Sequence, residues 1–171
     1  MNTSDFISSA DFRVFLDETL LACACQAVDY FLENNKAINN SQLHSIFPTL
    51  QSGGFKGLKE LIENQENKNS SKVNKAFWKF VSGLVENTPD SRDFSLHRQI
   101  SKELTKRHIL EDTTQAANKK QAGFMKKNNK KRIEEVMNQA AAVYFEHFTC
   151  HYFYKNNQNN NRKKEHMNGR T

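Results

Sequence analysis

Residues that break helices and close turns are scarce in this chain. Its 171 residues include only two prolines and six glycines. β-Sandwiches and barrels need frequent tight turns, in which these two residue types are concentrated, so the composition argues against both folds. Stretches rich in Lys, Glu, Gln, Ala and Leu, which are good helix formers, favour an all-α protein instead. A chain of this length fits one domain.

Long apolar runs and a cysteine framework are also lacking. No stretch reaches the roughly 18 apolar residues that indicate a membrane-spanning helix. The residues after Met1 are polar and acidic, so we expect no signal peptide. The three cysteines, an odd number, do not make a disulfide framework and fit reduced thiols. These absences predict a soluble protein of the cytoplasm that has no membrane contact.

The motifs of common enzyme classes are missing as well. The sequence contains no P-loop, no Gly-rich dinucleotide fingerprint and no serine nucleophile elbow. So few glycines also argue against loops that cradle phosphate groups. We therefore expect a protein that is not an enzyme, that works by binding and that needs no cofactor or metal.

Apolar residues recur at helical spacing through most of the chain. The patterns cover residues 11–35, 41–47, 55–64, 73–84, 91–109 and 131–154. Another helix, capped by Asp112 or Thr113 and carrying Ala116, Ala117 and Phe124, either breaks at Asn128-Asn129 or runs into the last helix. Pro48 is expected to stop or kink one helix, and Gly53-Gly54 to interrupt the pattern.

These segments predict one compact bundle of six or seven helices over residues 1–154. Residues 155–171 are rich in Asn, Lys and Arg and show no apolar pattern. Such a composition cannot bury enough apolar surface to order itself, which predicts a disordered basic tail.

Positive charge is concentrated in the C-terminal third. Residues 1–112 carry a net charge of −2 and residues 113–171 a net charge of +8, within a total of +6. Seven cations lie between Asp112 and Glu134, with no acid among them: Lys119, Lys120, Lys126, Lys127, Lys130, Lys131 and Arg132. An unopposed basic surface predicts an anionic partner. Because lysines act as point charges, the stretch favours contact with an RNA backbone over base reading.

Two other interpretations of the chain stay open. The basic face can meet an acidic protein, which would make the chain a helical protein-binding module. Arg92 and His97 match the R-x4-6-H motif of HEPN-type ribonucleases, in which a cation and a general acid/base cleave RNA without metal. The tail cations Arg162, Lys163 and Lys164 extend the basic field in either case.

Two residue clusters have both structural and functional interpretations. His147 and His151 share a helix face at metal-ligand spacing, near Cys150 in sequence, while Cys23 and Cys25 point apart on a helix. We expect these residues to pack rather than to bind metal. Six aromatic residues of the last helix occupy more than one face, which predicts either deep burial or docking on a neighbouring subunit: Tyr144, Phe145, Phe148, Tyr152, Phe153 and Tyr154.

Several features follow one another in an order that matches a known family. Ala22, Ala24 and Ala27 precede Ile46-Phe47-Pro48 and the run from Gly53 to Leu58, and a helix beginning at Thr113-Thr114 leads to a basic one with Ala140-Ala141-Ala142. Over residues 15–145 this order resembles the small all-helical subunit of type III (Cmr-type) CRISPR effector complexes. The departures are a longer N-terminus, the aromatic run after Val143 and the Asn-rich tail.

The resemblance implies an all-helical, non-catalytic subunit used in antiviral defence. Copies of such a subunit stack along the guide–target duplex, hold its backbone and contact other subunits of the complex. This implication agrees with the separate inference from the residues themselves, which is a lysine track without catalytic groups.

Overall fold

The computed structural model describes residues 2–68, 71–88 and 91–168, with side chains as far as Asn159. Within these residues the chain is mostly helical and contains no strand. The helices are α1 (Thr3–Ile7), α2 (Ala10–Val14), α3 (Leu21–Asn34), α4 (Asn40–His44), α5 (Ile46–Asn67), α6 (Lys72–Val85), α7 (Leu96–Lys106) and α8 (Lys119–Asn168), with a π-helical segment η1 (Phe15–Leu20) and a 3-10 turn η2 (Thr113–Gln115). Because η1 joins α2 to α3 without a break, these three elements count as one helix, and the described residues form seven helices. The predicted all-α bundle of six or seven helices is confirmed.

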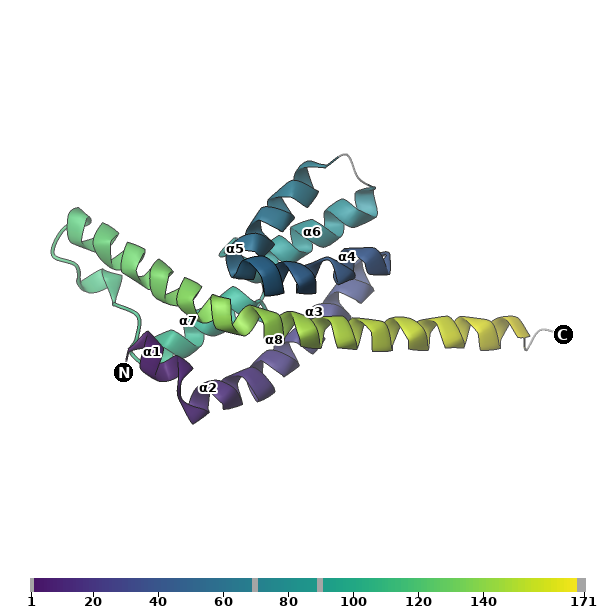
Figure 1. Cartoon of the computed structure of the whole chain (residues 1–171), viewed down its shortest axis with the longest axis horizontal. Helices are drawn as coiled ribbons and strands as arrows, with labels where there is room; N and C mark the ends of the chain where they lie inside the picture. Colours follow the sequence, from purple (N-terminus) through teal and green to yellow (C-terminus); the bar gives the residue numbers. More distant parts are fainter. Residues whose placement is uncertain (1, 69–70, 89–90, 169–171) are drawn as a thin grey trace.

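Helix α8 is the axis of the molecule (Figure 1). It crosses the whole fold, and α3, α5 and α7 all pack against it. Its C-terminal end runs well beyond the other helices, and its other end lies beside the segment that connects α7 to α8. The middle of α8 is therefore enclosed, while its two ends are much less covered.

The first long helical segment begins where the sequence predicts. The Ser9 side chain accepts a hydrogen bond from the backbone N–H of Phe12, and the segment ends at Asn35. Its apolar stripe turns inward, with Phe15, Leu20 and Phe31 buried. The π-helical segment inside it adds a residue to one turn without ending the helix.

Pro48 does not stop its helix, contrary to one of the two outcomes expected for it. It lies in the first turn of α5, where the backbone N–H that proline lacks would have no helical partner. The interruption comes instead at Gly54, with φ 59° and ψ −156°, a conformation open mainly to glycine. The expected Gly53-Gly54 break is confirmed, and it divides α5 into two helical parts.

Most of the aromatic residues of α8 are buried within this chain. Tyr144, Phe145, Phe148 and Tyr152 are at most 1% exposed. The two buried hydroxyl groups have partners, since Tyr144 donates to the carbonyl of Phe94 at 3.0 Å and Tyr152 accepts from the N–H of Ile38 at 2.8 Å. For these four residues the deep-burial interpretation is therefore the one that the structure supports.

The C-terminal part of α8 extends past the predicted end of the last helix. The sequence predicts that end at Tyr154, but the helical backbone continues to Asn168. Asn and Lys can continue a helix without packing, which is why no apolar pattern marks this extension. The tail as a disordered segment stays a prediction for residues 169–171, which lie outside the described residues.

Candidate nucleic-acid interface

Six lysines of the predicted basic stretch share one side of α8. Lys119, Lys120, Lys126, Lys127, Lys130 and Lys131 are all exposed. At 3.6 residues per turn they fall within an arc of about 140°. This arc, which we call the lysine arc, spans the first three and a half turns of the helix. The Asn118 side chain fixes its start, because it accepts a hydrogen bond from the N–H of Gln121 at 2.9 Å.

The opposite side of this part of α8 is fastened to the segment that follows α7. The Asn129 amide accepts from the N–H of Glu111 and donates to its carbonyl, both at 2.8 Å. Asn128 donates to the Glu111 carboxylate at 3.2 Å. Of the two outcomes predicted for Asn128-Asn129, the structure has the one in which the helix continues. These bonds explain why it does not break there. They also fix the rotation of α8 and so direct the lysine arc away from the α7–α8 connection.

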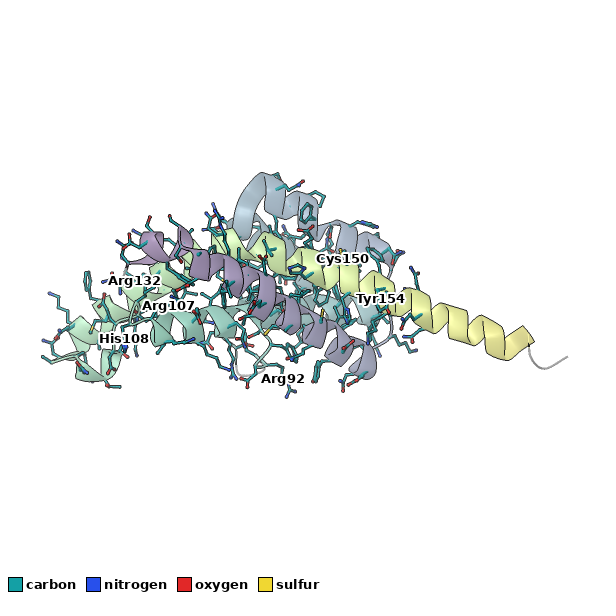
Figure 2. All side chains as sticks on the ribbon, turned by 90° about the horizontal axis from the view of Figure 1, so that it is seen from below. Arg92, Arg107, His108, Arg132, Cys150 and Tyr154 are labelled. Atoms are coloured by element: carbon teal, nitrogen blue, oxygen red, sulfur yellow. The ribbon has the colours of Figure 1, made fainter. Side chains whose placement is uncertain are left out.

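Arg132 belongs to this attachment and not to the lysine arc. Its guanidinium donates to the carbonyl of Ile109 at 2.7 Å and lies 3.1 Å from the Glu111 carboxylate. Figure 2 shows it near Arg107 and His108, which begin the α7–α8 connection. Charge alone placed Arg132 in the predicted interface, but its partners give it a structural role.

The lysine arc carries uncompensated positive charge. Among the residues that the structure describes, no carboxylate lies within ion-pair distance of any of its six ammonium groups. Glu134, the first acid after the arc, is paired with Lys59 at 3.1 Å instead. The arrangement can therefore attract an extended anion along about 20 Å of helix, at 1.5 Å per residue.

Phe124 lies at the edge of the lysine arc and not in the core. Its side chain is 64% exposed, the highest value among the large apolar residues of the described chain. Lys120 precedes it by four residues and Lys127 follows it by three, so both are its neighbours on the helix surface. The sequence predicts Phe124 on a helix capped by Asp112 or Thr113, whereas that part of the chain is the 3-10 turn η2 and the helix that carries Phe124 begins at Lys119. The residues that turn inward here are Ala122, Met125 and Asn129, a register that Phe124 does not share.

A cleft of about 500 Å³ opens along one edge of the lysine arc. Lys126 and Lys130 line it from α8, together with residues of α5, α6 and α7. His97 of α7 and Lys59 of α5 also face this cleft. Neither side chain could be linked to the lysines from the sequence, because Lys59 and His97 belong to other helices, distant along the chain.

Arg92 and His97, the pair that matches the ribonuclease motif, do not converge. Arg92 lines a different cavity, of about 460 Å³, where its guanidinium contacts the hydroxyl of Tyr30 at 3.0 Å and lies over the Tyr30 ring. His97 faces the cleft beside the lysine arc. Burial and the nearby Lys59 lower the pKa of His97, although Glu86 opposes the shift.

The clustered Cys and His residues named in the sequence are not assembled into a metal site among the described residues. No group of three potential ligands occurs among the described residues. His151 contacts the Asp29 carboxylate at 3.1 Å, and Asp29 also pairs with Lys155. Burial alone would raise the pKa of Asp29, but the hydrogen bonds from Lys155 and His151 lower it overall. His151 thus helps to anchor α8 to α3.

Two further sequence predictions concern the basic tail and membrane-spanning helices. The side chains of Arg162, Lys163 and Lys164 lie outside the described residues. In the described part of the chain, no helix is both long enough and apolar enough to cross a membrane.

Comparisons with known proteins do not place this chain in a family. No protein-family model, no curated protein and no solved structure matches it. The resemblance to the small subunit of Cmr-type CRISPR complexes therefore stays a prediction, and the geometry of the lysine arc is what bears on function.

Proposed function

We propose that this protein binds RNA through the lysine arc of α8, without catalysing a reaction. One observation carries the proposal: six exposed lysines share one side of a helix and have no carboxylate partner among the described residues. Solvated lysines of ordinary surfaces alternate with acids. Keeping six like charges together opposes folding slightly, and a polyanion would relieve that repulsion.

Binding would occur through the phosphate groups. Each ammonium group can approach a phosphate oxygen and release a condensed counterion, which favours association in a salt-dependent way. Lysine lacks the planar fork with which arginine reads guanine, and the only arginine of the stretch is engaged with Glu111. We therefore expect little sequence preference.

The resemblance to a known family suggests a wider role for the protein than RNA binding by the lysine arc. As a small subunit of a CRISPR-type ribonucleoprotein in the cytoplasm, the protein would hold the guide or target backbone and contact neighbouring subunits. The resemblance in the order of features supports this role, and so does the separation of Arg92 from His97, which leaves the alternative of a HEPN-like ribonuclease without an assembled pair.

A comparison of two quadruple variants tests the proposal. In the first, Lys126, Lys127, Lys130 and Lys131 are replaced by Ala. In the control, four exposed lysines far from the arc are replaced in the same way: Lys36, Lys68, Lys72 and Lys75. Both variants lose four positive charges, so a difference between them reports position and not net charge.

Affinity for a 20-nucleotide single-stranded RNA is measured by fluorescence anisotropy in low salt. We expect the arc variant to bind roughly ten- to a hundred-fold more weakly, since it loses four phosphate contacts, and the control to change by less than about two-fold. Equal losses in the two variants would reject a defined site, and an unchanged arc variant would reject RNA binding by the arc. An acidic polypeptide that competes with RNA more strongly than unlabelled RNA does would favour the protein-binding alternative.

A further inference from the structure

The cleft beside the lysine arc has the size and composition of a ligand site. Its volume of about 500 Å³ falls within the roughly 300–1,000 Å³ that is usual for small-molecule sites. Four elements meet around it: α5, the end of α6, the first turn of α7 and α8, with Thr113 of η2 at its margin. Because these elements belong to the packed body of the protein, the cleft is formed before any ligand arrives.

Its wall combines an apolar surface with a few polar groups. Phe55, Val85, Ile133 and Met137 supply the apolar part, and three of these four side chains are largely buried in the core. Asn87 and Thr113 add uncharged groups that can donate and accept hydrogen bonds. A flat heteroaromatic ring with polar edges suits such a lining better than an aliphatic or a fully charged ligand.

The charged groups of the cleft are not distributed evenly. Lys126 and Lys130 enter it from α8 without a carboxylate partner among the described residues, whereas Lys59 and Glu134 pair with each other at 3.1 Å. Glu86, at the end of α6, is the remaining carboxylate of the lining. The edge of the cleft that belongs to the lysine arc thus favours an anion, and the α6 wall favours a hydrogen-bond donor.

His97 contributes a polar group whose pKa is lowered by burial, which favours its neutral form. Its side chain is partly buried, and its Nδ1 lies 3.5 Å from the hydroxyl of Ser101. Desolvation and Lys59 both lower its pKa. A neutral imidazole offers one donor and one acceptor, which allows hydrogen bonding to a sugar hydroxyl or a base edge without adding charge.

We propose that this cleft takes one nucleotide of the RNA held by the lysine arc, with its base against the apolar wall and its phosphate at Lys126 and Lys130. The ribose and the base edge would meet Glu86, Asn87 and His97. This inference rests on the proposed function, because Lys126 and Lys130 belong to both surfaces. It adds that one position of the strand is unstacked and held, while the others are bound through phosphate alone.

Three variants of the full chain separate the cleft from the arc. Asn87→Trp fills the cleft from its exposed rim and leaves every lysine in place. Lys126→Ala with Lys130→Ala removes the cations that line the cleft. Lys127→Ala with Lys131→Ala removes the same charge from the arc outside the cleft. All the substituted side chains are exposed, and circular dichroism checks that each variant is folded.

The probes are the four ribonucleoside 5′-monophosphates, each titrated separately by NMR, with inorganic phosphate and the nucleosides as references. We expect saturable binding of at least one monophosphate, at least ten-fold tighter than phosphate or its nucleoside. Asn87→Trp and the 126/130 pair should each weaken it ten-fold or more, and the 127/131 pair by less than two-fold. Asn87→Trp should also weaken binding of the 20-nucleotide RNA several-fold.

Other outcomes would overturn the inference in distinguishable ways. If no monophosphate saturates while the RNA still binds through the arc, the cleft fails and the proposed function stands. If the 126/130 and 127/131 variants lost monophosphate affinity equally, the nucleotide would be attracted by the overall positive charge and not bound at the cleft. Loss of monophosphate binding in Asn87→Trp with unchanged RNA affinity would show that the cleft does not hold the strand. If neither RNA nor monophosphates bind, both proposals fail.

Discussion

The first third of α8 and its middle are parts of the same helix with opposite surroundings. In the middle, the side chains of Ala140, Tyr144 and Phe148 are fully buried among α3, α5 and α7. In the first third, the inward side is fastened by Asn129 and Arg132, and the outward side carries the lysine arc. The middle of α8 stabilises the fold by packing. The lysines of its first third make no ion pair within the described part of the chain.

This contrast separates stability from binding along one element. Truncating a buried side chain in the middle of α8 removes packing contacts and leaves the lysines exposed as before. Truncation on the outward side of the first third removes charge without a cavity or a lost partner. Variants of the two regions should therefore differ in whether the free energy of unfolding or the affinity for RNA changes.

The largest expected effect lies in the buried middle. Phe148→Ala should lower the free energy of unfolding by about 3–5 kcal/mol, because it removes a fully buried ring and leaves a cavity. Tyr154→Ala, in the same helix but 58% exposed, should change it by less than about 0.5 kcal/mol. Urea denaturation measures the free energy of unfolding of both variants. Similar losses at the two positions would mean that the middle of α8 is not the core.

The next effect concerns Phe124 at the edge of the lysine arc. If bases of a single strand stack on its exposed ring, Phe124→Ala should weaken binding of single-stranded RNA by about 1–3 kcal/mol. The salt dependence should stay the same, because no charge is removed. Phe47→Ala, at a partly exposed phenylalanine of α5, is the control. Anisotropy titrations with single- and double-stranded RNA would contradict stacking if both RNAs lost affinity equally.

Arg132 and Lys131 provide the closest test of the two sides of the helix. Arg132→Ala removes the contacts with Ile109 and Glu111 and should cost about 1 kcal/mol of stability, with less than a two-fold change in RNA affinity. Lys131→Ala should leave stability within about 0.5 kcal/mol and weaken RNA binding. Thermal unfolding and RNA titration of both variants decide the matter, and a reversed pattern would assign Arg132 to the interface.

The smallest effect concerns Asp29, which holds α8 to α3 through His151 and Lys155. The pKa of Asp29 is lowered in the folded state, so this carboxylate stabilises the fold above its unfolded pKa and stops doing so as the pH falls through the folded pKa. Asp29→Asn should cost less than about 1 kcal/mol at pH 7, since the group is partly exposed. Urea midpoints of the two proteins should converge as the pH falls through the folded pKa of Asp29, and a difference that persists once the carboxylate is protonated would exclude the ionic contribution.

Much of the fold follows from the apolar pattern. The first long helical segment and the break at Gly54 could be predicted, because each depends on nearby residues. The sequence could not decide whether α8 is continuous at Asn129, because the partner of this residue, Glu111, lies 18 positions earlier. Local propensity alone does not reveal such a partner.

The candidate site was predictable to a similar degree. Six of the seven predicted cations form the lysine arc, since a helix places residues of this spacing on one side. The surroundings of Arg132 and Phe124 could not be predicted, because charge and apolarity say nothing of the rotation of a helix that loop contacts fix. The cleft could not be predicted, since Lys59, His97 and Lys130 come from three separate helices.

The most direct test of RNA binding by the lysine arc is the salt dependence of affinity. The logarithm of the association constant for single-stranded RNA is measured against the logarithm of salt concentration. For the variant that replaces Lys126, Lys127, Lys130 and Lys131 by Ala, we predict a slope smaller in magnitude than the wild type by about 3, at roughly 0.7 per phosphate contact. Equal slopes in the two proteins would contradict contact between the lysine arc and the RNA backbone.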